Sequence, residues 1–209
     1  MKTKSFFTKS RWLVTIILLT TLGITNAWGT ETLYETITLV DGGSNSDSGT
    51  SFATNTSITT SVLTPKDSVT GFSAAAYVYP AKSGYGWKIG SSSNNGNITL
   101  TLAHTIKNVT KIVVSAQRYN TSKATNLNCN SIGNKAISNA ASFNNYEFTY
   151  TNATDVSSIN LTASAGTSGD RRCYVKSISI YYDKPASGYT VDKCINYFSL
   201  RQRSFAVSL

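Results

Sequence analysis

The fold of this chain is decided by residues 87–119, WKIGSSSNNGNITLTLAHTIKNVTKIVVSAQRY. Apolar and polar residues alternate over 97–102 and again over 111–117. Because successive side chains of a strand point to opposite sides, this alternation is typical of strands with one buried and one solvent-facing side. It predicts an inward set of Ile98, Leu100, Leu102, Ile112, Val114 and Ala116, and an outward set that includes Val113, Ser115 and Gln117.

A turn signal, Asn94-Asn95-Gly96, separates the strand that ends at 87–90 from the strand at 97–102. Asn and Gly tolerate the positive φ angles that two-residue hairpin turns need. Ala103-His104-Thr105 then reads as a loop before the next strand. We therefore expect three strands of one antiparallel sheet, with His104, the only histidine, in a solvated loop.

More strands of the same kind are predicted along the chain. Residues 68–79 are ambiguous, since three alanines favour a short helix and Tyr77-Val78-Tyr79 favours a strand. The other segments are 33–40, 125–129, 135–138, 146–151, 158–163 and 172–182. About nine strands separated by turn signals predict an all-β fold, an antiparallel β-sandwich.

Two of these segments carry finer signals. Tyr146, Phe148 and Tyr150 fall on one side of their strand. In the last strand the alternation slips between Val175 and Ile178, which predicts a β-bulge there.

Residues 1–29 have the layout of a secretory signal peptide. Basic residues precede an apolar run at 12–24, and small residues such as Ala27 offer a cleavage site. The run is shorter than the ~20 residues that span a bilayer, so we expect cleavage rather than a membrane anchor. The domain at 30–183 is then expected to be secreted or at the cell surface, with the periplasm as an alternative and no membrane contact.

Residues 184–209 differ in composition from the body of the chain. A Lys-Pro-Ala-Ser-Gly linker opens this segment, and the basic tail that follows lacks strand alternation. The tail is either an interaction peptide or the remainder of a second domain lost by truncation or a shifted reading frame. The change in composition favours the second explanation.

The net charge of +9 lies mostly at the two ends of the chain. Between residues 30 and 183 there are 11 Lys or Arg against 9 Asp or Glu. A nucleic-acid surface needs clustered cations, and the sequence shows only the pair Arg171-Arg172 in this region. We therefore expect no nucleic-acid partner, while the sequence does not indicate an oligomeric state.

Cys129, Cys173 and Cys194 are the only cysteines. Export permits a disulfide between Cys129 and Cys173, both on or beside predicted strands. The alternative, that both are small buried apolar residues, remains equally open. Cys194 lies in the tail, and the spacing of the three does not match a zinc site.

The phrases WKIGSSSNNGNITLTL, IKNVTKIVVSAQRY and VKSISIYY resemble β-sandwich modules of exported Bacteroidetes proteins. The resemblance covers 87–182 and implies a jelly-roll, galactose-binding-like domain at the cell surface or outside the cell. Such modules occur beside nucleases, glycoside hydrolases and Ig-like repeats. The resemblance implies no catalytic residue.

Catalytic chemistry has little support in the sequence. His104 has no Ser or Cys partner in any recognisable pattern. A glycosidase needs two carboxylates at a defined separation, and Glu147, on a predicted strand, has no evident partner. We expect no enzyme and no cofactor. Calcium is a minor alternative, because Asp41, Asp47 and Asp183 lie at strand ends or in a polar loop.

Aromatic residues give the best functional signal. Tyrosine and tryptophan rings stack on the apolar faces of sugars, while polar side chains bind the hydroxyl groups. The predicted ligand-binding residues are Tyr79, Tyr85, Trp87, Arg118 and Tyr119. For Trp87 a place in the core is the favoured alternative, because Trp is mostly buried.

The sequence therefore predicts a non-catalytic, secreted or surface module that binds carbohydrate. Two alternatives remain: a structural or adhesive spacer, and an accessory domain of a truncated extracellular hydrolase or nuclease. The first hypothesis requires aromatic rings gathered on one accessible surface.

Overall fold

The computed structural model describes residues 30–42, 63–64, 68–166 and 169–184. The predicted signal peptide, Asp47, Cys194 and the tail beyond Lys184 lie outside these residues. Residues 31–183 form one compact unit. Within the described ranges, no helix has the length and apolar character needed to cross a bilayer.

The described residues form ten strands and no helix, and the strands join into one continuous antiparallel sheet. Two long strands, β6 (Gly96–Arg118) and β9 (Asn144–Ala165), lie at its centre. The other strands are β1 (Thr30–Leu39), β2 (Leu63–Thr64), β3 (Val69–Ala76), β4 (Val78–Pro80), β5 (Trp87–Ile89), β7 (Thr125–Cys129), β8 (Asn134–Ile137) and β10 (Cys173–Lys184).

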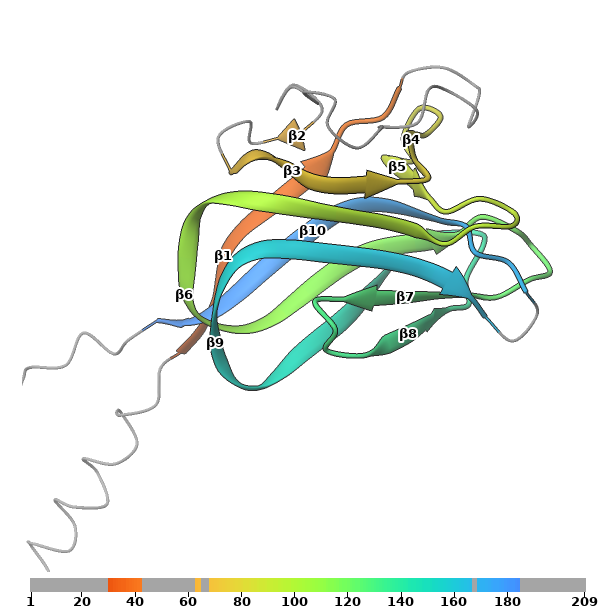
Figure 1. The fold of residues 1–209 in the computed structure, drawn as a ribbon. Coiled ribbons are helices and arrows are strands. Elements are labelled where there is room, and N and C mark those ends of the chain that lie inside the picture. The colour runs from red at the N-terminus through yellow and green to blue at the C-terminus, as the bar shows by residue number, and fades with distance from the viewer. Residues whose placement is uncertain (1–29, 43–62, 65–67, 167–168, 185–209) are drawn as a thin grey trace, which may run out of the picture. The chain divides into compact units, whose positions relative to one another are not determined.

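Bends in β6 and β9 carry the sheet from one layer to a second layer (Figure 1). The first part of β6, up to Leu102, pairs with β3 and with the end of β9. Its second part, from Val109 onward, pairs with β10 and with the start of β9. The β6–β9 register shifts between Thr101 and Lys111, where the two strands turn the corner together. The predicted β-sandwich is thereby confirmed.

Two details of the predicted sheet are wrong. Residues 97–102 and 111–117 belong to one strand, so His104 lies within β6 at its bend rather than in a loop. The same holds for 146–151 and 158–163, which are both part of β9.

The Asn94-Asn95-Gly96 turn also does not close a hairpin. β5 pairs with β4 and β10, whereas β6 starts against β3 and β9. The turn therefore crosses between the layers, and Gly96 is required there because a Cβ atom would overlap the backbone of Gly90.

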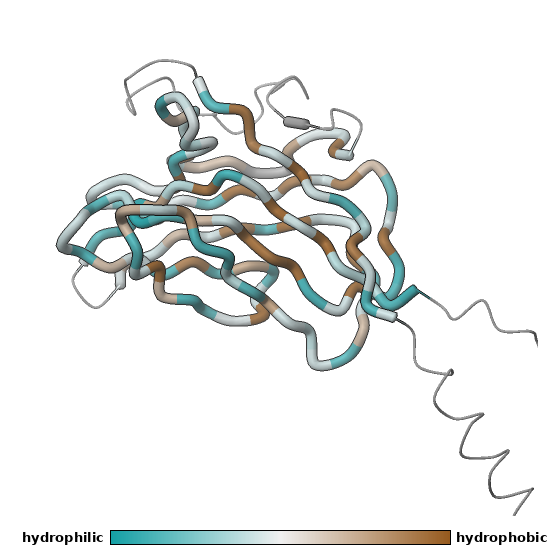
Figure 2. Tube along the Cα trace, turned by 180° about the vertical axis from the view of Figure 1, so that it is seen from behind, coloured by the Kyte–Doolittle hydropathy of each residue, from teal (hydrophilic) through white to brown (hydrophobic). Residues whose placement is uncertain are grey.

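The core lies between the two layers, and apolar residues recur along the strands in Figure 2. Ile98, Leu100, Ile112 and Val114 are fully buried, as the alternation predicts. Burial of one such side chain stabilises the fold by about 1.5–3 kcal/mol. The bulge in β10 is confirmed between Val175 and Ser177.

Val113 and Gln117 were predicted to face solvent, and both are buried. For Gln117 the reason is a covering segment, since its amide donates a hydrogen bond to the carbonyl of Ala140. The ambiguous residues 68–79 form the strands β3 and β4, which Tyr77 separates with a φ of 54°.

Candidate functional site

A row of side chains crosses four strands on the outer side of the β10 layer. Tyr79 on β4 pairs with Lys88 on β5, Lys88 with Tyr174 on β10, and Tyr174 with Gln117 on β6. Paired residues project to the same side of a sheet. Because neighbouring strands lie about 4.8 Å apart, the row is about 14 Å long.

Three more aromatic rings join this row from loops. Tyr85 comes from the turn between β4 and β5, Tyr119 follows β6, and Phe143 precedes β9. The ring of Tyr174 lies 4.8 Å from Tyr85 and 5.3 Å from Tyr119, measured between centroids. Tyr85 and Phe143 are 5.7 Å apart. Tyr174 is buried, whereas Tyr79, Tyr85, Tyr119 and Phe143 keep part of their surface exposed.

Cationic groups lie over these rings. The Lys82 ammonium is 4.2 Å from the centroid of Tyr85, and that of Lys88 is 4.5 Å from Tyr79. The Arg172 guanidinium is 4.2 Å from Tyr119, and the Lys176 ammonium is 5.7 Å from Phe143. We call this surface the tyrosine–cation face; its residues are Tyr79, Lys82, Tyr85, Lys88, Tyr119, Phe143, Arg172, Tyr174 and Lys176.

Asp170 fixes the position of Arg172. Its side chain is 1% exposed, and the carboxylate accepts bonds from Nε of Arg172 at 3.0 Å and from Nη2 at 2.9 Å. Burial alone would raise the pKa of Asp170, but the hydrogen bonds from Arg172 outweigh it and hold that pKa below its ordinary value. The ionised pair therefore keeps the guanidinium over Tyr119.

A tight turn positions Tyr85. Gly84 and Gly86 adopt φ angles of 83° and 65°, which favour glycine. The turn is closed by a 2.9 Å bond from the amide of Ala81 to the carbonyl of Gly86. Asp41 accepts a 2.6 Å bond from the amide of Gly84.

The structure brings together three of the five predicted ligand-binding residues: Tyr79, Tyr85 and Tyr119. Trp87 is fully buried, and its indole donates a 3.0 Å bond to the carbonyl of Val40, so it does not contribute to an accessible surface. Arg118 follows Gln117 in the alternation of β6 and projects to the opposite side, where its guanidinium donates to the carbonyl of Thr121.

Sequence reasoning missed Tyr174, Phe143 and the cations. The bulge before Ser177 was a usable signal, because it resets the alternation and leaves Tyr174 pointing outward between buried Cys173 and Val175. Lys88, Arg172 and Lys176 had no local signal, since each lies over a ring from another strand or loop, whereas Lys82 lies over Tyr85 of its own turn.

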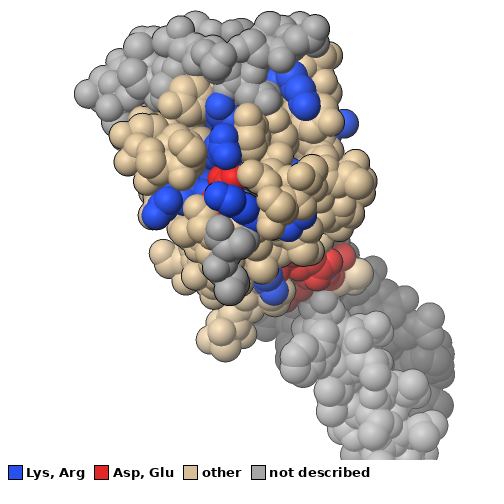
Figure 3. All heavy atoms as spheres, turned by 90° about the vertical axis from the view of Figure 1, so that its right-hand side faces the viewer, with Lys and Arg blue, Asp and Glu red and all other residues tan. Residues whose placement is uncertain are grey.

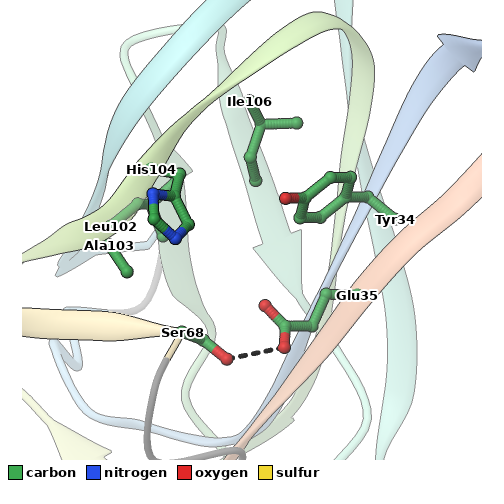
Figure 4. Close-up of a pocket in the computed structure, with 7 residues that line it drawn as sticks. All are labelled: Tyr34, Glu35, Ser68, Leu102, Ala103, His104 and Ile106. Atoms are coloured by element: carbon green, nitrogen blue, oxygen red, sulfur yellow. Dashed lines mark hydrogen bonds between the residues drawn. The ribbon is translucent and has the colours of Figure 1, made fainter.

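A pocket of about 380 Å³ lies at the bend of β6 (Figure 4). Its wall includes His104, Glu35 and Ser68, and the Ser68 hydroxyl donates a 2.6 Å bond to Glu35. In a Ser-His-acid triad the serine donates to histidine instead. Glu35 is the one carboxylate among the described lining residues, whereas a glycosidase uses two.

A second pocket, of about 390 Å³, lies beside the turn after β7. Asn130 spans it, with its amide donating to the Tyr150 hydroxyl at 2.8 Å and to the Ser158 carbonyl at 3.1 Å. Its side-chain oxygen accepts from the amide of Asn160 at 2.6 Å. These bonds tie the turn to β9, which is a structural role.

Cys129 and Cys173 are both free and buried, so the disulfide is wrong and the alternative of small buried apolar residues is confirmed. Burial raises the pKa of each thiol to about 12. Of the residues proposed for calcium, Asp41 caps the turn at Gly84. In the part of the chain that the structure describes, no three His, Cys, Asp or Glu residues gather as a metal site.

No protein-family model matches this chain, and no curated protein does. Among solved structures, a family 29 carbohydrate-binding module aligns with 77% of this chain and 97% of its own, at 9% identity and a TM-score of 0.39. The xylan-binding module CBM15 aligns with 76% of this chain and 99% of its own, at 10% identity and a TM-score of 0.38.

A family two carbohydrate esterase from Cellvibrio japonicus aligns with 49% of this chain at 12% identity and a TM-score of 0.32. The match spans only 29% of the esterase. With TM-scores below 0.5, these likenesses carry no argument about a ligand, and the fold assignment rests on the strand pairing described above.

Proposed function

We propose that residues 31–183 form a non-catalytic module that binds carbohydrate at the tyrosine–cation face. The observation that carries this proposal is the gathering of the part-exposed rings of Tyr79, Tyr85 and Tyr119 on one outer side of the sandwich. Part-exposed aromatic rings offer stacking surface for sugar rings, and neighbouring polar groups supply orientation.

The chemistry of this face supports binding rather than catalysis. The carboxylate of Asp170, beside this face, is buried and paired with Arg172, so it is unsuited to proton transfer. Among the described residues that line the pocket at His104, the carboxylate is Glu35, which accepts a bond from Ser68.

We also infer that the module is exported, as the pattern of residues 1–29 indicates. The resemblance of residues 87–182 to β-sandwich modules of exported Bacteroidetes proteins supports the same inference. A structural or adhesive spacer is the alternative, and it predicts that no glycan binds.

A glycan array probed with the purified protein tests the proposal. We expect binding that Tyr119→Ala and Tyr85→Ala each weaken about tenfold, which corresponds to about 1.4 kcal/mol. Tyr119→Phe, which keeps the ring, should retain binding. Thermal unfolding of each variant separates lost binding from lost folding.

Tyr181→Ala is the matched control. Tyr181 lies on the outer side of the same strand, β10, and it also has a lysine over its ring, with the Lys111 ammonium at 4.7 Å. It lies outside the tyrosine–cation face, so its replacement should leave glycan binding unchanged. Absence of binding to any glycan, or an equal loss in the Tyr181 variant, would contradict the proposal.

A further inference from the structure

We propose that the glycan bound by the tyrosine–cation face is acidic, with carboxylate or sulfate groups on its sugars. This inference rests on the carbohydrate-binding function proposed above and specifies its ligand class. Two features of the face support it: the positions of the cations over the rings, and the way in which Asp170 holds Arg172.

Cations already occupy ring faces that a sugar would use. Lys82 lies over Tyr85, and Lys88 lies over Tyr79 while its ammonium is also 5.8 Å from the centroid of Tyr119. A neutral sugar that stacks on these rings must displace the ammonium groups and lose their attraction to the rings. An anionic sugar gains an ion pair with the same groups, so stacking and charge act together.

The charge balance at this end of the sandwich favours an anion. Figure 3 shows Lys and Arg side chains gathered around a small acidic area. The tyrosine–cation face contributes four cations, Lys82, Lys88, Arg172 and Lys176, against two neighbouring carboxylates: Asp170, which pairs with Arg172, and Asp41, which accepts a bond from the Gly84 amide. A local excess of positive charge attracts anionic ligands and increases their rate of association.

Arg172 is held in an orientation suited to a second anion. Its guanidinium has five N–H groups, and two of the nitrogens, Nε and Nη2, donate to Asp170. The hydrogen bonds of the described residues use no other N–H of this guanidinium, so three remain for a ligand. Arginine binds planar anions such as carboxylates through two parallel bonds.

Calorimetric titration of the purified protein with two matched pairs of polysaccharides tests the inference. Polygalacturonate carries ionised carboxylates that its methyl ester replaces with uncharged ester groups, and dextran sulfate differs from dextran by its sulfate groups. We expect at least one acidic member to bind ten times or more tightly than its neutral partner. Tighter binding of the acidic member of the first pair would identify carboxylate as the anionic group that the face recognises. Tighter binding of the acidic member of the second pair would identify sulfate.

Two lysine variants test whether the preference for an acidic glycan arises at the tyrosine–cation face. Lys88→Gln should weaken binding of the preferred acidic glycan several-fold and lower its dependence on salt concentration. Lys135→Gln, the same change at an exposed position of β8, should alter neither. An equal effect of both variants would overturn the inference, because binding would then follow net charge alone.

The remaining outcomes separate this inference from the proposed function. Equal binding of neutral and acidic members overturns the acidic preference and leaves carbohydrate binding intact. Binding to no polysaccharide of either pair, together with an empty glycan array, overturns both. Equally tight binding of polyglutamate or single-stranded DNA also overturns the inference, since the face would then be a general polyanion surface.

Discussion

Replacing Asp170 by Asn tests how the cationic part of the tyrosine–cation face is held. The Asp170 carboxylate accepts three bonds from Arg172: from the backbone amide at 2.9 Å, from Nε at 3.0 Å and from Nη2 at 2.9 Å. The Asn side chain can still accept the first two. Its NH₂ group faces Nη2 as a second donor, so the third bond is lost and the charge attraction disappears.

The magnitude follows from this loss. A hydrogen bond to a charged group is worth about 1.5–3 kcal/mol. The side chain of Asp170 is 1% exposed and that of Arg172 is 22% exposed, so water recovers only a small part of the energy. We expect Asp170→Asn to lower the free energy of unfolding by about 2–3 kcal/mol at pH 7, a fall in Tm of about 4–12 °C for a domain of this size.

The pH dependence of the stability difference between the variant and the wild type is a second test. The pKa of Asp170 is held below its ordinary value in the folded protein. Its contribution is therefore present above the unfolded-state pKa of about 3.9, and it is lost as pH falls through the folded-state pKa. The variant should therefore show its full loss in free energy of unfolding at pH 7, and this loss should become smaller below about pH 4.

Urea unfolding followed by circular dichroism at pH 7 and at pH 3 measures both effects. Asp155→Asn is the control, because Asp155 forms an exposed ion pair with Lys107 and its loss should barely move the midpoint. A deficit for Asp170→Asn below about 1 kcal/mol at pH 7, or one that is unchanged at pH 3, would refute the reasoning.

Three further predictions concern the interior. Gly90→Ala should lower the free energy of unfolding by about 2 kcal/mol or more, since φ is 94° and a Cβ would overlap the carbonyl of Arg171; a wild-type urea midpoint would contradict this. Trp87→Phe should cost about 1–2 kcal/mol in the same assay, because the carbonyl of Val40 loses its indole donor; a smaller cost than 0.5 kcal/mol would count against the bond. At pH 8 iodoacetamide should leave Cys129 and Cys173 unlabelled in the native protein and label both in urea, because the pKa of each thiol is about 12; mass spectrometry of the peptides decides.

The strands could be predicted from the sequence because alternation is a local property. It placed Ile98, Leu100 and Ile112 inward, and the slip in phase located the β10 bulge. The bends of β6 and β9 were not predictable in the same way. Residues 103–110 break the alternation, and such a break is typical of a loop. They contain no Gly or Pro that would mark a bend within a continuous strand. Register shifts against β9 accommodate these residues, and that partner is distant in sequence.

The candidate site was predictable only in part, for a similar reason. Tyr79 and Tyr85 lie in one short segment, so their grouping was visible in the sequence. Tyr174 reaches them through the pairing of β10 with β5, and Arg172 reaches Tyr119 through the pairing of β10 with β6. Contacts that depend on the register of strands far apart in sequence leave no local pattern. Trp87 was wrongly included in the predicted site. Aromatic residues that are close in sequence can lie on opposite sides of a strand, and the ring of Trp87 is on the buried side.

Mapping of amide chemical shifts by nuclear magnetic resonance, during titration with the best-binding glycan, tests the central claim most directly. The account predicts perturbed amides at Lys82–Lys88, at Tyr119 and at Arg172–Lys176, with those near His104 and Asn130 unchanged. Perturbation centred on the His104 pocket or on the Asn130 turn, with the tyrosine–cation face unaffected, would contradict the account.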